Sequence, residues 1–163
     1  MKKRKEAAGK KDEERLIAEV EKKKSSSCSM TFHMTDAKKM LASVSKIIEA
    51  GNEVVFGEKS WIRHKESGKK IALKKEGNVF VMEVMFKDGG EKKKGKIVVD
   101  SGAAENVMPW AWLENSRTMS KQEGIRFVAA NGGTMGNYGR RIVDFEPMYE
   151  EEEAEEQGFK RHA

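Results

Sequence analysis

Alternating apolar and polar residues predict that the middle of the chain is built mainly of β-strands. The longest predicted strand runs from Asn78 to Phe86, and its apolar residues at even positions from Phe80 onward would share one face. The opposite face is also apolar except for Glu83, which is typical of a strand at the centre of a sheet or at an interface. Shorter strands are predicted at Thr31–Met34, Glu53–Phe56, Trp61–His64, Ile71–Leu73, Ile97–Val99, Ile125–Ala130 and Arg141–Phe145.

Two segments have helical spacing instead. In Glu13–Lys24 the apolar stripe is only one turn wide, which predicts a charged helical arm. That stripe consists of Leu16, Ile17 and Val20. A second, short helix would be capped by Thr35 or Asp36 and stopped by Gly51. Its apolar face would consist of Met40, Leu41, Val44, Ile47 and Ile48.

Charged residues make up 36 % of the 163 residues, and they gather at both ends and in one internal run. Residues 1–24 contain ten Lys or Arg against six Asp or Glu, whereas Tyr149–Ala163 contain six Glu against two basic residues. This distribution predicts one folded domain at residues 30–148, between a charged arm with a serine-rich linker (1–29) and an acidic tail (149–163). Lys87–Lys96, with two adjacent glycines and five lysines, is predicted to be a linker or an exposed hairpin tip.

The composition also argues against several classes of protein. Cys28 is the only cysteine, so a small secreted fold held by internal disulfides is excluded. The basic start is followed by more charge, unlike a signal peptide, and no run approaches the ~18 apolar residues of a membrane span. We therefore expect an intracellular protein, cytoplasmic or nuclear, that is not secreted and has no membrane partner. The three histidines, His33, His64 and His162, lack metal-ligand spacing, so we expect no metal and no cofactor.

One short motif carries candidate chemistry. The β-branched run Ile97–Val99 leads directly into Asp100, Ser101 and Gly102. A strand that ends in Asp-Ser-Gly presents a carboxylate on a tight turn, and the glycine lets a second backbone or a substrate come close. The alternative is an ordinary turn capped by an aspartate. The glycines within Asn131–Gly139 do not form a phosphate-binding G-x-G-x-x-G, and the predicted strands on either side favour a β-hairpin.

Three segments together resemble one family. VVDSGAAENVMP around Asp100 resembles the active-site segment of retroviral-type (retropepsin-like) aspartic proteases, most closely those of copia-like retrotransposons. Phe127–Gly132 followed by Gly136–Gly139 is similar to the segment that forms their flap hairpin, and Thr31–Phe56 is similar to their Leu-x-Ser-Val helix segment. The resemblance covers about residues 30 to 145. It implies a mainly β fold, a retropepsin-like closed β-barrel with one short helix, to which the charged N-terminal helical arm is attached.

The order of the segments differs from that of the family. In the family the Asp triplet comes first, then the flap and then the helix segment, whereas here residues 30–86 carry the helix segment and residues 97–148 carry the triplet and the flap. We therefore expect a circular permutation in which residues 87–96 link the family's C-terminal half to its N-terminal half. Two alternatives are that the back half of one protease unit is joined to the front half of another, or that the chain is a fragment without a competent site.

The resemblance implies an aspartic endopeptidase that hydrolyses a peptide or polyprotein through an activated water. This chemistry needs two carboxylates that share a proton, and the chain has one Asp-Ser-Gly, so a second copy would supply the other in a two-fold homodimer. Asp100 would act as acid and base, Ser101 would hydrogen-bond across the dyad, and Gly102 would leave room for coplanar carboxylates.

The resemblance also implies roles around this dyad. The hairpin Asn131–Gly139 would be the flap, and Leu41–Val44 would pack behind the catalytic loop, with Ala42 and Ser43 where many retroviral proteases carry glycine. The flap and pocket would include Ala130, Asn131, Gly132, Gly133, Met135 and Gly136. Further pocket residues would be Val107, Met108 and Val128.

Two other function classes remain as alternatives. A catalytically inactive module would keep the protease-like dimer for dimerisation or peptide binding. A nucleic-acid-binding protein would use the basic N-terminal arm, although Ile97–Met148 has five basic and six acidic residues and so predicts no basic face across the fold.

Overall fold

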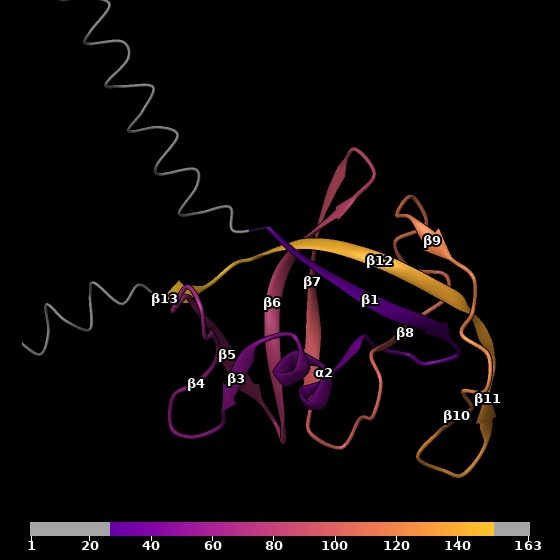
Figure 1. Ribbon diagram of the computed structural model, residues 1–163, viewed down its shortest axis with the longest axis horizontal. Helices are drawn as coiled ribbons and strands as arrows, with labels where there is room; N and C mark the ends of the chain where they lie inside the picture. The colour runs from indigo at the N-terminus through magenta and orange to yellow at the C-terminus, as the bar shows by residue number, and fades with distance from the viewer. Residues whose placement is uncertain (1–26, 152–163) are drawn as a thin grey trace, which may run out of the picture.

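The computed structural model describes residues 27–151, so the predicted helical arm and the acidic tail beyond Glu151 lie outside the described residues. The fold is mainly β, as predicted, with a closed barrel and a single described helix, α2 (Val44–Glu49). Figure 1 shows the arrangement. The strands are β1 (Cys28–Thr35), β2 (Leu41–Ser43), β3 (Asn52–Val55), β4 (Ser60–His64), β5 (Lys70–Glu76), β6 (Val79–Asp88), β7 (Glu91–Asp100), β8 (Val107–Pro109), β9 (Thr118–Met119), β10 (Phe127–Val128), β11 (Thr134–Met135), β12 (Asn137–Pro147) and β13 (Glu150–Glu151).

Six strands close the barrel. They follow one another in the order β6, β7, β2, β8, β1 and β12, and β12 then pairs with β6. Neighbours are antiparallel except for two parallel pairs, β2 with β7 and β1 with β8. Because β1 and β12 pair along almost the whole of β1, Cys28 at the start of β1 lies opposite Phe145 near the end of β12.

Additional strands extend this barrel on two sides. β5, β4 and β3 continue the sheet outward from β6, and β3 forms its outer edge because it pairs only with β4 among the described strands. β10 and β11 form a separate two-stranded hairpin at the far side of the molecule from β3–β5 (Figure 1). No helix within residues 27–151 is long and apolar enough to cross a membrane.

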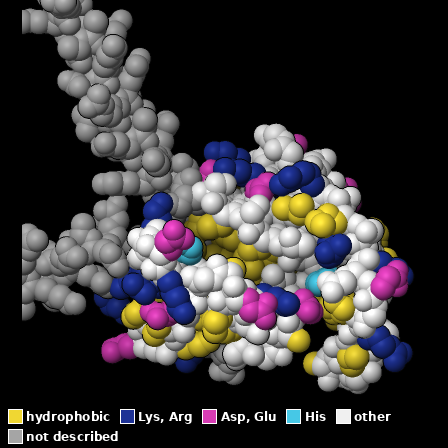
Figure 2. Space-filling view, viewed as in Figure 1, with side chains coloured by type: hydrophobic (Ala, Val, Ile, Leu, Met, Phe, Trp, Pro, Cys, Tyr) yellow, Lys and Arg dark blue, Asp and Glu magenta, His cyan; other side chains and the backbone are white. Residues whose placement is uncertain are grey.

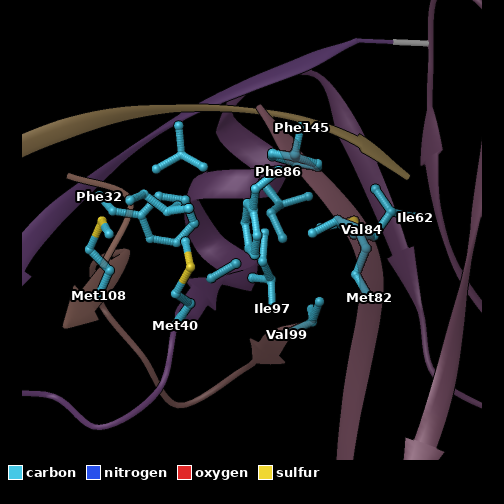
Figure 3. Packing of buried hydrophobic residues seen from close by; sticks show 14 of the residues in the cluster. Phe32, Met40, Ile62, Met82, Val84, Phe86, Ile97, Val99, Met108 and Phe145 are labelled. Carbon is cyan, nitrogen blue, oxygen red and sulfur yellow. The ribbon is translucent and has the colours of Figure 1, made fainter. Parts of the chain in front are cut away.

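The core fills the barrel with side chains from all six strands. Met82, Val84 and Phe86 on β6 are buried, which confirms the predicted alternation of this strand. β6 also pairs with β5, β7 and β12, so it is central, as its two apolar faces indicated. Figure 3 shows these side chains packed against Phe32, Met40, Ile97, Val99, Met108 and Phe145.

The second predicted helix is much shorter than its apolar pattern suggested. Leu41–Ser43 is strand β2, and helix α2 begins only at Val44, with the Ser43 hydroxyl accepting a hydrogen bond from the Lys46 amide at 3.3 Å. Thr35 and Asp36 are therefore not its cap. The reason is tertiary: pairing with β7 satisfies the backbone of β2, and this outweighs a weak local preference for helix. Gly51 does follow the helix end, with a φ of 94° that suits glycine.

Two other predictions change in detail. Lys87–Lys96 is a β-hairpin with its turn at Gly89 and Gly90, so the hairpin alternative is correct and the segment is not an unstructured linker. Its tip projects beyond the barrel (Figure 1). The strand expected at Ile125–Ala130 contracts to Phe127–Val128, because only these two residues find partners on β11.

Gly95 is required by close packing in this hairpin. A Cβ atom at Gly95 would lie 2.9 Å from Cδ2 of Phe86 and closer still to Cε2, and the Phe86 ring is buried. We expect Gly95→Ala to destabilise the fold by about 1–3 kcal/mol, because a buried ring cannot move aside without strain. Urea unfolding checks this, with Gly90→Ala as the matched control, since a Cβ there meets nothing within 4 Å. Equal losses in the two variants would contradict the packing explanation.

Candidate active site

Asp100 is the last residue of β7 and stands on a tight turn, half-buried. Its Oδ1 accepts a hydrogen bond from the Gly102 amide at 2.8 Å, and its carbonyl oxygen accepts one from Ala103 at 3.4 Å. Ser101 and Gly102 are exposed, and a Cβ at Gly102 would come within 3.3 Å of the same carboxylate oxygen. The turn therefore presents an oriented carboxylate next to a residue without a side chain.

Strand β2 lies directly beside this carboxylate-bearing strand. Its residues Leu41–Ser43 run parallel to Val98–Asp100, with Ser43 opposite Asp100. Helix α2 then starts at the next residue, so the end of β7 and the start of α2 are held together. The structure thus places the Leu41–Val44 segment next to the Asp100 turn, although the two are far apart in the sequence.

Asn106 joins β1 and β2 near this turn, and it was not predicted from the sequence. Its side chain is buried, with Oδ1 accepting from the Ser43 amide at 2.8 Å and Nδ2 donating to the Thr31 carbonyl at 3.1 Å. Its own carbonyl accepts from the His33 amide at 2.8 Å. The only signal was a polar residue immediately before the apolar pair Val107-Met108.

The expected flap segment forms the hairpin of β10 and β11. Its turn is closed by the Ala129 amide, which donates to the Gly133 carbonyl at 2.7 Å, and by the Gly133 amide, which donates to Asn131 Oδ1 at 2.9 Å. Ala130 and Gly132 are exposed in this turn. Met135 and Gly136 follow it on the return side, half-buried.

Asp36 holds the return side of this hairpin. One of its carboxylate oxygens accepts from the Gly136 amide at 2.7 Å and the other from the Tyr138 hydroxyl at 2.8 Å. The hydrogen bond to Asp36 raises the pKa of Tyr138, and burial and the negative charge of Asp36 add to this shift. The Tyr138 ring also packs against Trp110, with 5.9 Å between centroids. Asp36 therefore connects the loop after β1 to the hairpin instead of capping a helix.

Not every predicted pocket residue is available to a ligand. Met108 is fully buried in the barrel core and Val107 is buried beside it, so the prediction that they line an open pocket is wrong for this chain on its own. Both were placed there by resemblance, but β8 is an interior strand of the barrel. Val128 is exposed on the hairpin, where it is accessible to a ligand.

A cavity of about 600 Å³ lies on the outer face of β6 and β7. We call it the lysine-lined cavity. Its walls include Val98, which is two residues before Asp100 and therefore on the same face of β7. Its lining also includes apolar residues and several charged ones: Val79, Val81, Trp112, Glu76, Lys39, Lys93, Lys94 and Lys96. This cavity was not predicted from the sequence, because the lysines of residues 87–96 were assigned to a linker or an exposed hairpin tip.

A second cavity, of about 660 Å³, lies between β1, α2 and the strands β4 and β5. Figure 2 shows apolar side chains at the bottom of a hollow in this face. His33 lines this cavity with Nε2 3.4 Å from Glu105 Oε2, and its Nδ1 is buried without a hydrogen-bond partner. Burial lowers the pKa of His33 and outweighs the opposing effect of Glu105, which favours a neutral ring here.

Within residues 27–151, no group of three or more His, Cys, Asp or Glu side chains is placed to hold a metal ion. The candidate site consists of the oriented Asp100 carboxylate, the neighbouring lysine-lined cavity, and the β10–β11 hairpin held by Asp36. No family model, no curated protein and no solved structure matches this chain.

Proposed function

We propose that the protein is an aspartic endopeptidase of the retropepsin type whose active site is completed by a second copy of the chain. The observation that carries the proposal is Asp100 at the end of β7. Its carboxylate is oriented by the Gly102 amide, and it stands beside the start of α2. An ordinary turn capped by an aspartate would not require β2 and the start of α2 to lie beside it.

The closed barrel supports the circularly permuted form of this proposal. Residues 30–86 and 97–148 interleave in one barrel, since β2 pairs with both β7 and β8, and β1 pairs with both β8 and β12. The hairpin between β6 and β7 joins the two parts within a single chain. The unusual order of the segments is therefore compatible with one complete barrel per chain, without an exchange of halves between copies.

A second copy would pack against the surface around Asp100. Ile48 of α2 and Phe56 after β3 are exposed, and Val79 is exposed on the opposite face of β6 from Phe80. The Phe56 ring contacts Phe80 at 4.6 Å between centroids, and Phe80 lies opposite Val99, the residue before Asp100. A two-fold axis beside the Asp100 turn, where Ser101 and Gly102 are exposed, would bring the two aspartates together.

The chemistry follows from placing two such carboxylates in contact. Like charges at that distance do not both ionise, so the pair holds one proton. The ionised Asp100 takes a proton from a water molecule, which attacks the peptide carbonyl carbon, while the protonated Asp100 of the second copy donates to the carbonyl oxygen. Collapse of the tetrahedral intermediate breaks the C–N bond and transfers a proton to the leaving amine.

The hairpin of β10 and β11 supplies the cover that such a reaction uses. Its exposed turn at Ala129–Gly133 is free to lie over an extended peptide, while Asp36 holds its base through Gly136 and Tyr138. Covering the peptide excludes water other than the attacking molecule and strengthens the electrostatic interactions within the site.

An inactive protein-binding module is the second candidate. The observation that favours it is that Ala42 and Ser43, where many retroviral proteases have glycine, are both fully buried against β7. Their side chains occupy space behind the Asp100 turn. The third alternative, nucleic-acid binding through the basic arm, concerns residues outside the described part.

Cleavage and oligomeric state together test the proposal. The protein is incubated with a mixed peptide library between pH 4 and 7, and its mass is measured by sedimentation at the same concentration. We expect a dimer that cleaves the library. A dimer that cleaves nothing would favour the binding module, and a monomer would remove both candidates, because a lone Asp100 has no partner.

A further inference from the structure

We infer that the lysine-lined cavity binds an acidic peptide segment that carries a large apolar side chain. This inference rests on the proposed function, because it makes the cavity a specificity-determining subsite beside Asp100. It goes further by naming the class of peptide that the site prefers.

The walls of the cavity provide the apolar part of the site. Val81 lies opposite Val98 across the β6–β7 ladder, and both side chains point away from the barrel core. Val79 continues this face toward Asp100 and is 41 % exposed, and Trp112 is 44 % exposed. A cavity of about 600 Å³ with such walls is large enough for a Phe, Leu or Met side chain and its backbone.

The lysines provide the electrostatic part. Lys96 Nζ pairs with Glu76 at 2.7 Å, and Lys93 Nζ pairs with Asp88 at 2.9 Å. Lys39 and Lys94 also line the cavity, and neither has a carboxylate partner among the described residues. Two positive charges therefore face the cavity without compensation from residues 27–151, and carboxylates of a bound peptide would supply it.

The positions of these groups limit where the acidic residues fall. Lys94, Lys96, Val98 and Asp100 share one face of β7, at a rise of about 6.8 Å for every second residue. Val98 is thus about 7 Å from Asp100, and Lys94 is about 20 Å away. An extended peptide therefore has its large apolar residue close to the scissile bond and its acidic residues within about six positions of it. A two-fold axis would repeat this preference on the other side.

The cavity fits a peptide better than a nucleic acid. Single-stranded nucleic acids are held by stacking of bases on aromatic rings along a basic groove. Of the residues lining this cavity near Asp100, Trp112 is the accessible aromatic ring, whereas Val79, Val81 and Val98 are aliphatic. Aliphatic walls with isolated lysines favour carboxylates attached to an apolar chain.

Binding to the full-length Asp100→Asn protein tests the inference without requiring cleavage. The probes are two fluorescein-labelled octapeptides, one with a central Phe and four flanking Glu and the other with four Gln in their place. At low salt we expect the acidic probe to bind about tenfold more tightly, and the difference to shrink as salt is added. Lys39→Glu and Lys94→Glu should each remove most of the difference.

The matched control is Lys65→Glu, which makes the same change of charge on an exposed turn that lines neither cavity. It should leave the preference intact. Equal affinity for the two probes, or an equal effect of Lys65→Glu and Lys94→Glu, would overturn the inference. So would tighter binding of a fluorescein-labelled twelve-nucleotide oligothymidylate that Lys94→Glu abolishes, because that result would assign the lysines to nucleic acid.

The same variants separate this inference from the proposed function. In the Asp100-containing protein, Lys94→Glu should lower cleavage of the acidic peptide about tenfold relative to the Gln peptide. If the parent protein cleaves both peptides equally, the proposed function stands and this inference fails. If the parent cleaves neither peptide but Asp100→Asn prefers the acidic probe, the proposed cleavage fails and the cavity remains a site for acidic peptides.

Discussion

Exchange of Asp100 for asparagine is expected to abolish peptide cleavage. The amide neither takes a proton from water nor donates one to the carbonyl oxygen, and acid–base groups of this kind contribute about 10²- to 10⁴-fold to rates. The fold should not suffer, because Asn keeps the size of the side chain and its oxygen can still accept from the Gly102 amide. The measurement is the initial rate of cleavage at equal protein concentration, together with a urea unfolding curve for each protein.

The control for this comparison is Asp144→Asn. Asp144 is half-buried on β12, lines neither of the two cavities and belongs to a barrel strand remote in sequence from the Asp100 turn. It should cleave like the parent. Equal background cleavage by the parent and by Asp100→Asn, with both dimeric, would show that any observed hydrolysis comes from elsewhere.

Asp88 is expected to give the largest change in stability. Its fully buried carboxylate accepts hydrogen bonds from Lys93 Nζ at 2.9 Å, from the Asn115 amide at 2.9 Å and from Ser116 Oγ at 3.1 Å. These bonds connect the β6–β7 hairpin to the loop that follows β8. Asp88→Ala should cost about 3 kcal/mol, because the Asn115 amide and the Ser116 hydroxyl lose their acceptor and Lys93 loses its ion-pair partner. Urea unfolding at pH 7 measures the loss.

The same residue gives the stability a defined pH dependence. Burial alone would raise the pKa of Asp88, but the hydrogen bonds from Lys93, Ser116 and Asn115 together outweigh it and lower the pKa below 3.8. The carboxylate therefore stabilises the fold fully above pH 3.8, and this contribution is lost as the pH falls further toward the folded-state value. Asp88→Ala should flatten the dependence of stability on pH below about 4.

Glu114→Gln is the matched control, since Glu114 is an exposed acid in the same loop. It should unfold like the parent at pH 7 and keep the same loss of stability on acidification. An Asp88→Ala protein as stable as Glu114→Gln would mean that the hairpin and the loop are held together by packing alone.

Much of the strand arrangement could be predicted from the sequence, because alternation reflects which side chains face a core. Met82, Val84 and Phe86 alternate with less buried residues, and the apolar residues on both faces of the strand identified β6 as central. The stop at Gly51 was also predictable, because a positive φ after a helix favours glycine. The Asp100 turn followed from a β-branched run that ends in Asp-Ser-Gly.

Other features depend on contacts between distant segments, which local patterns do not reveal. Leu41 has helical spacing with Val44 and Ile48, yet it lies in a strand because β7 and β8 lie on either side. Asn106 and Asp36 are ordinary polar residues in the sequence, and only folding brings Asn106 to Ser43 and Asp36 to Tyr138. The lysine-lined cavity likewise appears only when the hairpin strand β7 is paired with β6.

The central claim is that one active site needs an Asp100 from each of two chains, and mixing tests it most directly. The parent protein and Asp100→Asn are combined in equal amounts, allowed to exchange partners, and assayed at a fixed total concentration that keeps both dimeric. If each site needs both aspartates, only the parent homodimers cleave, and random pairing leaves about one quarter of the activity of the undiluted parent. Retention of about one half would contradict the claim, because it would mean that each chain carries a complete site of its own.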